Sequence, residues 1–506
     1  MILGKSRLWA SIGFALFGIG LLLRAALYFP PAMFQIDSDA VLSGLCAFRI
    51  ADGQYPAFFP GGTRLSAASC YVAAAYFHLF GAGRAGLALT ALTWAALYLA
   101  FTLLFLRAML GPRLACLGFL FAIVPSEQFM TVTYAPWGYG EIVASCAATL
   151  WLATLWRNTA ALWQRFCFGL SVGLGFWFSM ETLMISLPAI AWVALKRRDA
   201  TVEEGGPAFL GAMVGAIPFL AGNVTHGFPS LTQNWASRPT SSIAQAWANG
   251  VWLTTYLIPK LLFRSSGWWS ETTLLIVAYA FVAAGFVLAV RRRRENSRFA
   301  HDSRDTATLL LLVLAACLLI FSFSQAGTSR GWTVRYIAPL YVVVPLFCAL
   351  GIEALWTWSK ALSVGVVAAL LVPNLLLYGL PGSATRAELT AELSNDVHLR
   401  DILARDGIRM VYGDYFWVYH LNFDSDERIA GVPSVRAVDY FDYGGELGTS
   451  TVRWALLGGL DEVRRFARVA SAHGTLTPDG DLWVFIADRP TANAAQLITT
   501  LRRASN

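Results

Sequence analysis

The sequence predicts an α-helical membrane protein with about 11 transmembrane helices, followed by a small C-terminal α/β domain outside the cytoplasm. Three observations predict this fold class. The 506 residues are 57% hydrophobic and only 14% charged, with a mean hydropathy of +0.55, which is too apolar for a soluble globular surface. Short basic loops separate long apolar runs. After residue 382 the composition changes to that of a soluble domain.

The basic clusters fix the number of spans if all of them lie in the cytoplasm. They are Lys5/Arg7, Arg107/Arg113, Arg157/Arg165, Lys196 to Arg198, Arg291 to Arg294 with Arg298 and Arg304, and Lys360. The apolar runs between them predict spans at 8–29, 84–106, 113–132, 139–156, 166–178, 181–195, 207–222, 272–290, 306–325, 336–356 and 361–380. The first run is long enough to cross roughly 30 Å of hydrocarbon, so we expect a retained helix and not a cleaved signal peptide.

Two long loops, 30–83 and 223–271, are expected outside the cytoplasm. The apolar run 65–80 would turn the next basic loops outward if it crossed, so we expect a helix that lies on or dips into the membrane. Residues 229–269 alternate aromatic, polar and small side chains, which is typical of interfacial helices. The run 166–195 is interrupted only at 179–181, which predicts two short helices that meet at an external turn.

The charges divide the chain into two domains. Residues 1–382, the predicted transmembrane domain, hold 25 Lys+Arg against 14 Asp+Glu, whereas residues 383–506 hold 13 against 17. The positive excess lies in short loops, so it indicates topology and excludes a nucleic-acid footprint. In the tail, "GIRMVYG" and "DLWVFIAD" predict strands, and "GLDEVRRFARVASAHG" predicts an amphipathic helix.

The seven cysteines show no metal-binding spacing. Most of them lie inside apolar runs and are expected to be small core residues: Cys116, Cys146, Cys167, Cys317 and Cys348. Only Cys46 and Cys70 fall in the first external loop, where a disulfide could form.

Two carboxylates, Asp37 and Asp39, stand one residue apart where the first span ends, in "FQIDSDAVLSGL". Two close carboxylates repel each other, which raises at least one pKa toward the range of a general base. The structural alternative is that Asp caps the short helix predicted by "DSDAVLSGLCAFRI". We take Asp39 as the candidate base and Asp37 as its orienting partner, or the reverse, and both as candidate ligands of a divalent cation.

A second group of candidates surrounds the turn in "VPSEQFMTVTYAPWGYGEIVASC". Glu127 and Glu141 flank this turn, and Trp137 and Tyr139 beside Glu141 are candidates for stacking on a sugar. The structural alternative for Glu141 is stabilisation by the dipole at a helix N-terminus. Glu181, alone in an apolar stretch, is costly unless it faces a water-filled cavity.

A third group lies in "SQAGTSRGWTVRYIAPLY", where Arg330 and Arg335 stand at the external end of a span, against the positive-inside trend. A guanidinium binds phosphate through two parallel hydrogen bonds. The structural alternative is contact with lipid headgroups. Weaker members of this external basic set are Arg24, Arg64, Arg84, Arg238, Lys260 and Arg264.

The segments "IDSDAVLSGLCAFRIADGQYPAFF", "AAAYFHLFG", "WGYGE" and "RYIAPLY" occur in this order. Together they resemble bacterial membrane glycosyltransferases of the GT-C superfamily, the family 39-related group of the protein O-mannosyltransferases and lipid A aminoarabinose transferase. The resemblance covers the membrane part from the first to the tenth span, and "YGDYFWVYHLNFDSDERI" is similar to the soluble tail of some members.

The resemblance implies a polyprenyl-phosphate sugar donor, a glycan, lipid or protein acceptor, and an active site on the non-cytoplasmic face of the bacterial inner membrane. It also implies a first-loop Asp as the catalytic base. The sequence departs from the pattern at Ala40 and Ser69, where members often carry Glu. These departures favour a second hypothesis, a non-catalytic scaffold or binding protein of the same fold. A third hypothesis, a lipid or sugar transporter, is supported by Glu181 but lacks an internal repeat.

Overall fold

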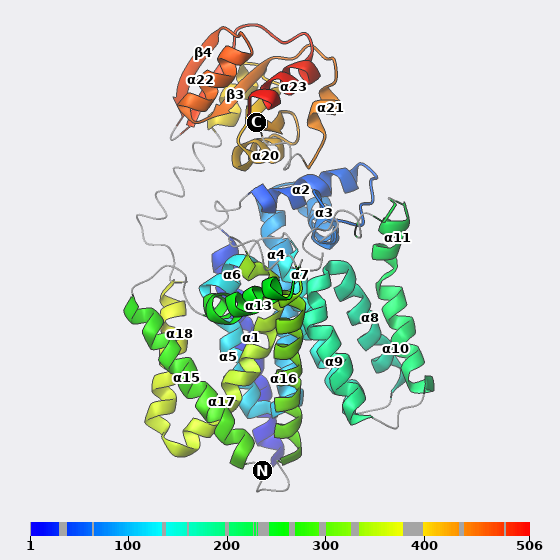
Figure 1. The fold of residues 1–506 in the computed structure, drawn as a ribbon, viewed down its shortest axis with the longest axis vertical. Helices are drawn as coiled ribbons and strands as arrows, with labels where there is room; N and C mark the ends of the chain where they lie inside the picture. Colours follow the sequence, from blue (N-terminus) through cyan, green and yellow to red (C-terminus); the bar gives the residue numbers. More distant parts are fainter. Residues whose placement is uncertain are drawn as a thin grey trace. The chain divides into compact units, whose positions relative to one another are not determined.

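The computed structural model is mainly helical (Figure 1) and describes residues 2–29, 38–62, 65–133, 138–158, 161–197, 202–225, 227–228, 230, 242–262, 269–292, 300–324, 333–377, 398–434, 440–479 and 482–505. Its internal contacts divide the chain into two compact units. The first, called here the membrane unit, comprises Met1–Ala26, Gly62–Ala68 and Ala91–Gly379. The second, the tail unit, comprises Leu27–Gly61, Ser69–Thr90 and Leu380–Asn506.

Helices build nearly all of the described membrane unit, and α1 and α4 also have residues that belong to the tail unit. Their bounds are α1 Ile2–Tyr28, α4 Arg84–Leu110, α5 Pro112–Ile123, α6 Glu127–Thr133, α7 Tyr139–Asn158, α8 Leu162–Phe178, η2 Met180–Thr182, α9 Leu183–Lys196, α10 Val202–Gly215, α11 Ile217–Thr225, α13 Ile243–Trp252, η4 Leu253–Leu257, α14 Ile258–Leu262, α15 Trp269–Arg292, α16 Ala300–Ser322, η6 Thr333–Val343, α17 Val344–Trp358 and α18 Lys360–Leu377. The predicted turn at 179–181 is confirmed by η2 between α8 and α9.

The predicted number of spans is not confirmed. Within the described residues, four helices are long and apolar enough to cross a membrane, or up to six if each of two bent pairs counts as one span. Several predicted spans correspond to shorter helices, such as α9 with 14 residues. A helix rises about 1.5 Å per residue, so one of this length covers only about 21 Å.

Two of the predicted spans are bent pairs of helices and not single straight helices. The predicted span 113–132 is α5 followed by α6 at 73°, and 207–222 is α10 followed by α11 at 47°. Pro125 lies in the first break, where it cannot donate a backbone hydrogen bond and restricts Val124. Ser126 Oγ then accepts a hydrogen bond from the Phe129 backbone N–H at 3.3 Å, which starts α6 with a serine cap.

The backbones of α8 and α10 lie in direct contact where these helices carry glycines. A Cβ atom at Gly169 would meet the Ala208 carbonyl oxygen at 1.7 Å, and one at Gly211 would meet the Phe166 carbonyl oxygen at 2.1 Å. Small residues allow such close approach, which supplies the van der Waals contact that drives helix association in lipid. A larger side chain at Gly169 or Gly211 is therefore incompatible with this pairing.

Arg24 is not a member of the external basic set. Only 1% of its surface is exposed, and its guanidinium donates hydrogen bonds to the carbonyls of Ala122 at 2.9 Å and Ile123 at 3.1 Å. These carbonyls lie in the last turn of α5, which has no helical partners for them, so a cation there satisfies them and complements the helix dipole. Arg24 therefore stabilises the end of α5.

The tail unit combines two helices of the first loop with a five-stranded sheet. Its helices are α2 Ser38–Ala51, α3 Ala68–Phe80, α20 Tyr415–Asp424, α21 Tyr443–Leu447, α22 Leu460–Val469 and α23 Ala494–Ser505, and its strands are β1 Met410–Gly413, β2 Ala430–Pro433, β3 Trp454–Gly458, β4 Gly474–Asp479 and β5 Leu482–Ala487. The strand order is β2-β1-β3-β5-β4; β2, β1 and β3 are parallel, and β5 and β4 are antiparallel additions. Strands β1 and β5 and helix α22 lie where the sequence predicts them.

Cys46 of α2 and Cys70 of α3 form a disulfide, with their Cα atoms 5.6 Å apart. The five free cysteines, Cys116, Cys146, Cys167, Cys317 and Cys348, are buried or half-buried, as expected for core residues. The bridge closes a loop of 24 residues, and it fixes α2 to α3 within the tail unit.

Removing the disulfide by the double substitution Cys46→Ser/Cys70→Ser is expected to destabilise α2 and α3 by about 3 kcal/mol, the loop entropy of a bridge of this size. Hydrogen exchange of α2 and α3 amides in the full-length protein measures the change. The double substitution Cys317→Ser/Cys348→Ser, which removes two free thiols, serves as the matched control. Equal α2 and α3 protection in the wild type and in Cys46→Ser/Cys70→Ser would contradict the expectation.

Candidate functional site

The carboxylate of Glu141 is held at the start of α7, at the end of the membrane unit away from the N-terminus (Figure 1). Glu141 is completely buried. It accepts a hydrogen bond from Ser66 Oγ at 2.7 Å, and the Ser66 backbone N–H donates to the Phe178 carbonyl at 3.1 Å. Helix N–H groups and a hydroxyl donor offset the cost of burying a carboxylate, so Glu141 is fixed in one orientation.

Helix η6, which carries Arg335, connects the predicted candidates of the membrane unit. It packs against α6, α7 and η2, the elements on which Glu127, Glu141 and Glu181 lie. Arg335 is partly exposed, and its guanidinium lies 5.4 Å from the Tyr336 ring centroid. The fold therefore gathers the elements that carry three predicted acidic residues around the element that carries the predicted cation.

Tyr341 fixes η6 against α6. Its hydroxyl accepts a hydrogen bond from the Ser126 backbone N–H at 2.9 Å, and its ring stacks on Phe129 at 4.3 Å. The 3₁₀ geometry of η6 has 3.0 residues per turn, so Arg335, six positions earlier, lies on the same side of η6 as Tyr341. Sequence reasoning missed Tyr341. In "RYIAPLY", Arg335 and Tyr341 are six positions apart, which puts them on one side if the segment forms a 3₁₀ helix.

The structure describes the remaining predicted residues unevenly. Tyr139 is completely buried in the first turn of α7, and Glu127 and Glu181 are partly exposed. Asp39 lies in the first turn of α2, where its backbone is described and its side chain is not. Six predicted residues lie outside the described part of the chain: Asp37, Arg64, Trp137, Arg238, Arg264 and Arg330.

Within the described residues, no group of three or more His, Cys, Asp or Glu side chains is arranged to hold a metal ion. The predicted divalent-cation ligands, Asp37 and Asp39, have side chains outside that set. Their role as metal ligands stays a prediction.

A charged cluster that sequence reasoning missed joins α2 to the C-terminal part of the tail unit. Arg49, in the last turn of α2, pairs with Glu427 at 3.3 Å and with Glu446 at 2.8 Å. The guanidinium also lies 5.7 Å from the Tyr443 ring centroid, and Tyr443 donates a hydrogen bond to Glu427 at 2.6 Å. Because Arg49 and Glu446 are 397 positions apart, local sequence carries no signal of this cluster.

Arg84 makes a second link within the tail unit. Its guanidinium donates two hydrogen bonds to Asp424, at 2.6 and 3.2 Å, in the fork geometry that makes arginine–carboxylate pairs strong. The side chain of Asp424 is only 21% exposed. Arg84, predicted as a weak member of the external basic set, therefore binds a carboxylate of α20.

The stability of α20 is expected to rise with pH between about 4 and 6.5 because of His420. Burial, together with the nearby Arg84, lowers the pKa of His420 to about 4, whereas an unfolded histidine titrates near 6.5. In this window the unfolded state binds a proton that the folded state does not, so unfolding becomes harder as pH rises, by on the order of 2 kcal/mol.

Hydrogen exchange of α20 amides in the full-length protein at pH 4.5 and pH 7 measures this effect. Burial raises the pKa of Glu427, which gives an opposite slope, so the comparison of wild type with His420→Gln isolates the histidine. The variant is expected to lose the part of the pH-dependent gain in α20 stability that comes from His420. Identical pH dependence of α20 exchange in both proteins would refute this role of His420.

The comparisons with known proteins concern structure alone, since no protein-family model and no curated protein sequence matches this chain. The chain is similar to ArnT from Cupriavidus metallidurans bound to undecaprenyl phosphate, with a TM-score of 0.63 and 12% identity over 96% of this chain and 98% of that chain. For apo ArnT from the same bacterium the TM-score is 0.61, with 14% identity over 98% and 99% of the two chains. The apo oligosaccharyltransferase of Archaeoglobus fulgidus gives 0.48, with 12% identity over 92% and 73%.

The likeness to ArnT extends over nearly the whole length of both chains, so it includes the helices and the C-terminal sheet. An identity of 12–14% with the two ArnT structures makes this a likeness of fold. The chain therefore shares the fold of ArnT.

Proposed function

We propose that this protein is an integral membrane glycosyltransferase that moves a sugar from a polyprenyl-phosphate donor to an acceptor hydroxyl. The observation that carries the proposal is the end-to-end likeness to an ArnT structure that holds undecaprenyl phosphate. The acceptor, a glycan, a lipid or a protein, is left open.

The reaction face is the non-cytoplasmic side of the bacterial inner membrane. Disulfides persist in oxidising compartments and are rare in the cytosol, and the Cys46–Cys70 bridge belongs to the tail unit. The basic loops of the membrane unit support the same orientation. The tail unit would thus lie outside the cytoplasm.

In the proposed reaction Asp39, with Asp37 as its orienting partner, takes the proton of the acceptor hydroxyl. The acceptor oxygen bonds to the anomeric carbon, the bond from that carbon to the phosphate oxygen breaks, and polyprenyl phosphate leaves. Arg335 neutralises the charge that develops on the phosphate. Arg64 and Arg330 are proposed to assist there, and Glu127, Tyr139, Glu141, Glu181 and Trp137 to shape the sugar site.

The test is turnover of the purified protein in lipid nanodiscs with undecaprenyl-phosphate donors that carry different labelled sugars. We expect one sugar class to be transferred to a cell-envelope acceptor mixture, with release of undecaprenyl phosphate. Heat-treated protein and donor-free reactions are the controls. Failure of every donor to bind would overturn the proposal.

The second candidate function is a scaffold that keeps the fold and the donor site without turnover. Ala40 and Ser69, where the resemblance expects Glu, are both completely buried. A carboxylate at either place would need a buried partner, so these positions are built for small side chains. Donor binding without transfer of any sugar would favour this function.

A further inference from the structure

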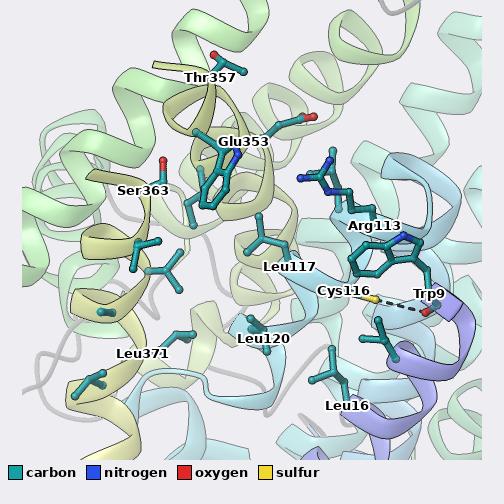
Figure 2. A pocket seen from close by; sticks show the side chains of 18 residues that line it. Trp9, Leu16, Arg113, Cys116, Leu117, Leu120, Glu353, Thr357, Ser363 and Leu371 are labelled. Carbon is teal, nitrogen blue, oxygen red and sulfur yellow. Dashed lines mark hydrogen bonds between the residues drawn. The ribbon is translucent and has the colours of Figure 1, made fainter. Parts of the chain in front are cut away.

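A cavity of about 790 Å³ lies in the membrane unit between α1, α5, α17 and α18 (Figure 2). Trp9 is in the first half of α1, Arg113 is in the first turn of α5, and Thr357 is in the last turn of α17. These positions place the cavity toward the end of the membrane unit where α1 begins, which is the predicted cytoplasmic end. The cavity thus lies apart from α6, α7 and η2, the elements that carry the predicted acidic residues of the proposed site.

The cavity changes from charged to apolar along its length. In Figure 2, Arg113, Glu353 and Thr357 lie at one end, and Leu16, Leu120 and Leu371 lie at the other. Arg113 and Leu120 are seven positions apart on α5, which separates them by about 10 Å along the helix axis. Such a gradient fits an amphiphile whose head lies at the charged end, with its chain among the leucines.

The charged end carries groups of both signs. Figure 2 shows the side chains of Arg113 and Glu353 extending toward each other across this end of the cavity. Two tryptophans, Trp9 and Trp356, also line the cavity, and tryptophan is enriched at the headgroup level of membranes. With the predicted orientation of the spans, the charged end would lie at the level of the phospholipid headgroups of the cytoplasmic leaflet.

We propose that this cavity binds a zwitterionic phospholipid with a primary ammonium group, its phosphate on Arg113 and its ammonium on Glu353. A guanidinium binds phosphate through paired hydrogen bonds, and a carboxylate accepts hydrogen bonds from a primary ammonium. Phosphatidylglycerol has the same phosphate but a neutral glycerol, which leaves the Glu353 carboxylate without a cation, and a quaternary ammonium has no N–H to donate. The site therefore selects phosphatidylethanolamine over phosphatidylglycerol and phosphatidylcholine.

Native mass spectrometry of the full-length protein with these three lipids, matched in acyl chains, tests the proposal. We expect phosphatidylethanolamine to bind on the order of tenfold more tightly than the other two, which corresponds to one charge-assisted hydrogen bond. Glu353→Gln should abolish this preference, and Arg113→Gln should weaken the binding of all three. Arg107→Gln removes an exposed cation of α4 that does not line the cavity, and it should change nothing.

A steric pair of variants on α18 locates the lipid. Ala368 lines the cavity, so Ala368→Trp should prevent phosphatidylethanolamine binding. Gly365 on the same helix has open space around it and does not line the cavity, so Gly365→Trp should leave binding intact. Equal binding of the three lipids to the wild type, or displacement of bound phospholipid by undecaprenyl phosphate, would overturn the proposal; displacement would assign the cavity to the tail of the donor.

Discussion

Replacing Asp39 with asparagine is expected to lower turnover by about a hundredfold or more, the scale of a lost general base. Asn keeps the shape of the side chain and its ability to cap a helix. The neighbouring residues Ala40 and Val41 are fully buried, and the disulfide at Cys46 ties α2 to α3. The fold and donor binding should therefore stay intact.

The measurement is single-turnover sugar transfer, combined with direct binding of the donor. Asp52→Asn is the matched control, because Asp52 directly follows α2 and is exposed, and the change removes the same charge. Asp37→Asn should lower turnover less if Asp37 orients Asp39, and more if the order of roles is reversed. Wild-type turnover in both the Asp37 and the Asp39 variant, with donor bound, would leave these carboxylates as helix caps.

Replacing Arg335 with alanine is expected to weaken binding of undecaprenyl phosphate by roughly 10- to 100-fold, because one hydrogen bond to a charged group is worth about 1.5–3 kcal/mol. Arg335→Lys should restore only part of the affinity, since an ammonium keeps the charge but loses the planar fork. Tyr341 holds η6 against α6, so the helix should keep its place in both variants.

Equilibrium binding of labelled undecaprenyl phosphate to the purified variants measures this effect. Arg107→Ala, at the other end of the membrane unit on the last turn of α4, controls for the loss of a positive charge. Unchanged affinity in Arg335→Ala would mean that Arg335 contacts lipid headgroups and does not bind the donor phosphate. A loss in Arg335→Ala that Arg335→Lys fully repairs would show that charge alone matters.

The sequence by itself determined the elements whose signals are local. The apolar runs place α1, α4 and α7 close to their observed bounds, and the interruption at 179–181 places η2. In the tail, β1, β5 and α22 follow from short alternating or amphipathic patterns. The break between α5 and α6 was not predicted, although Pro125 and Ser126 are a helix stop and a helix start in the sequence.

Only the tertiary structure decided how distant residues meet. Ser66 and Glu141 are 75 positions apart, and Arg49 and Glu446 are 397 positions apart. No short stretch of the sequence therefore indicates either pair. The role of Arg24 was likewise decided by the unsatisfied carbonyls at the end of α5. Hydrophobic periodicity indicates which face of an element is buried. The partner of a buried charge depends instead on which distant segments of the chain the fold brings next to it.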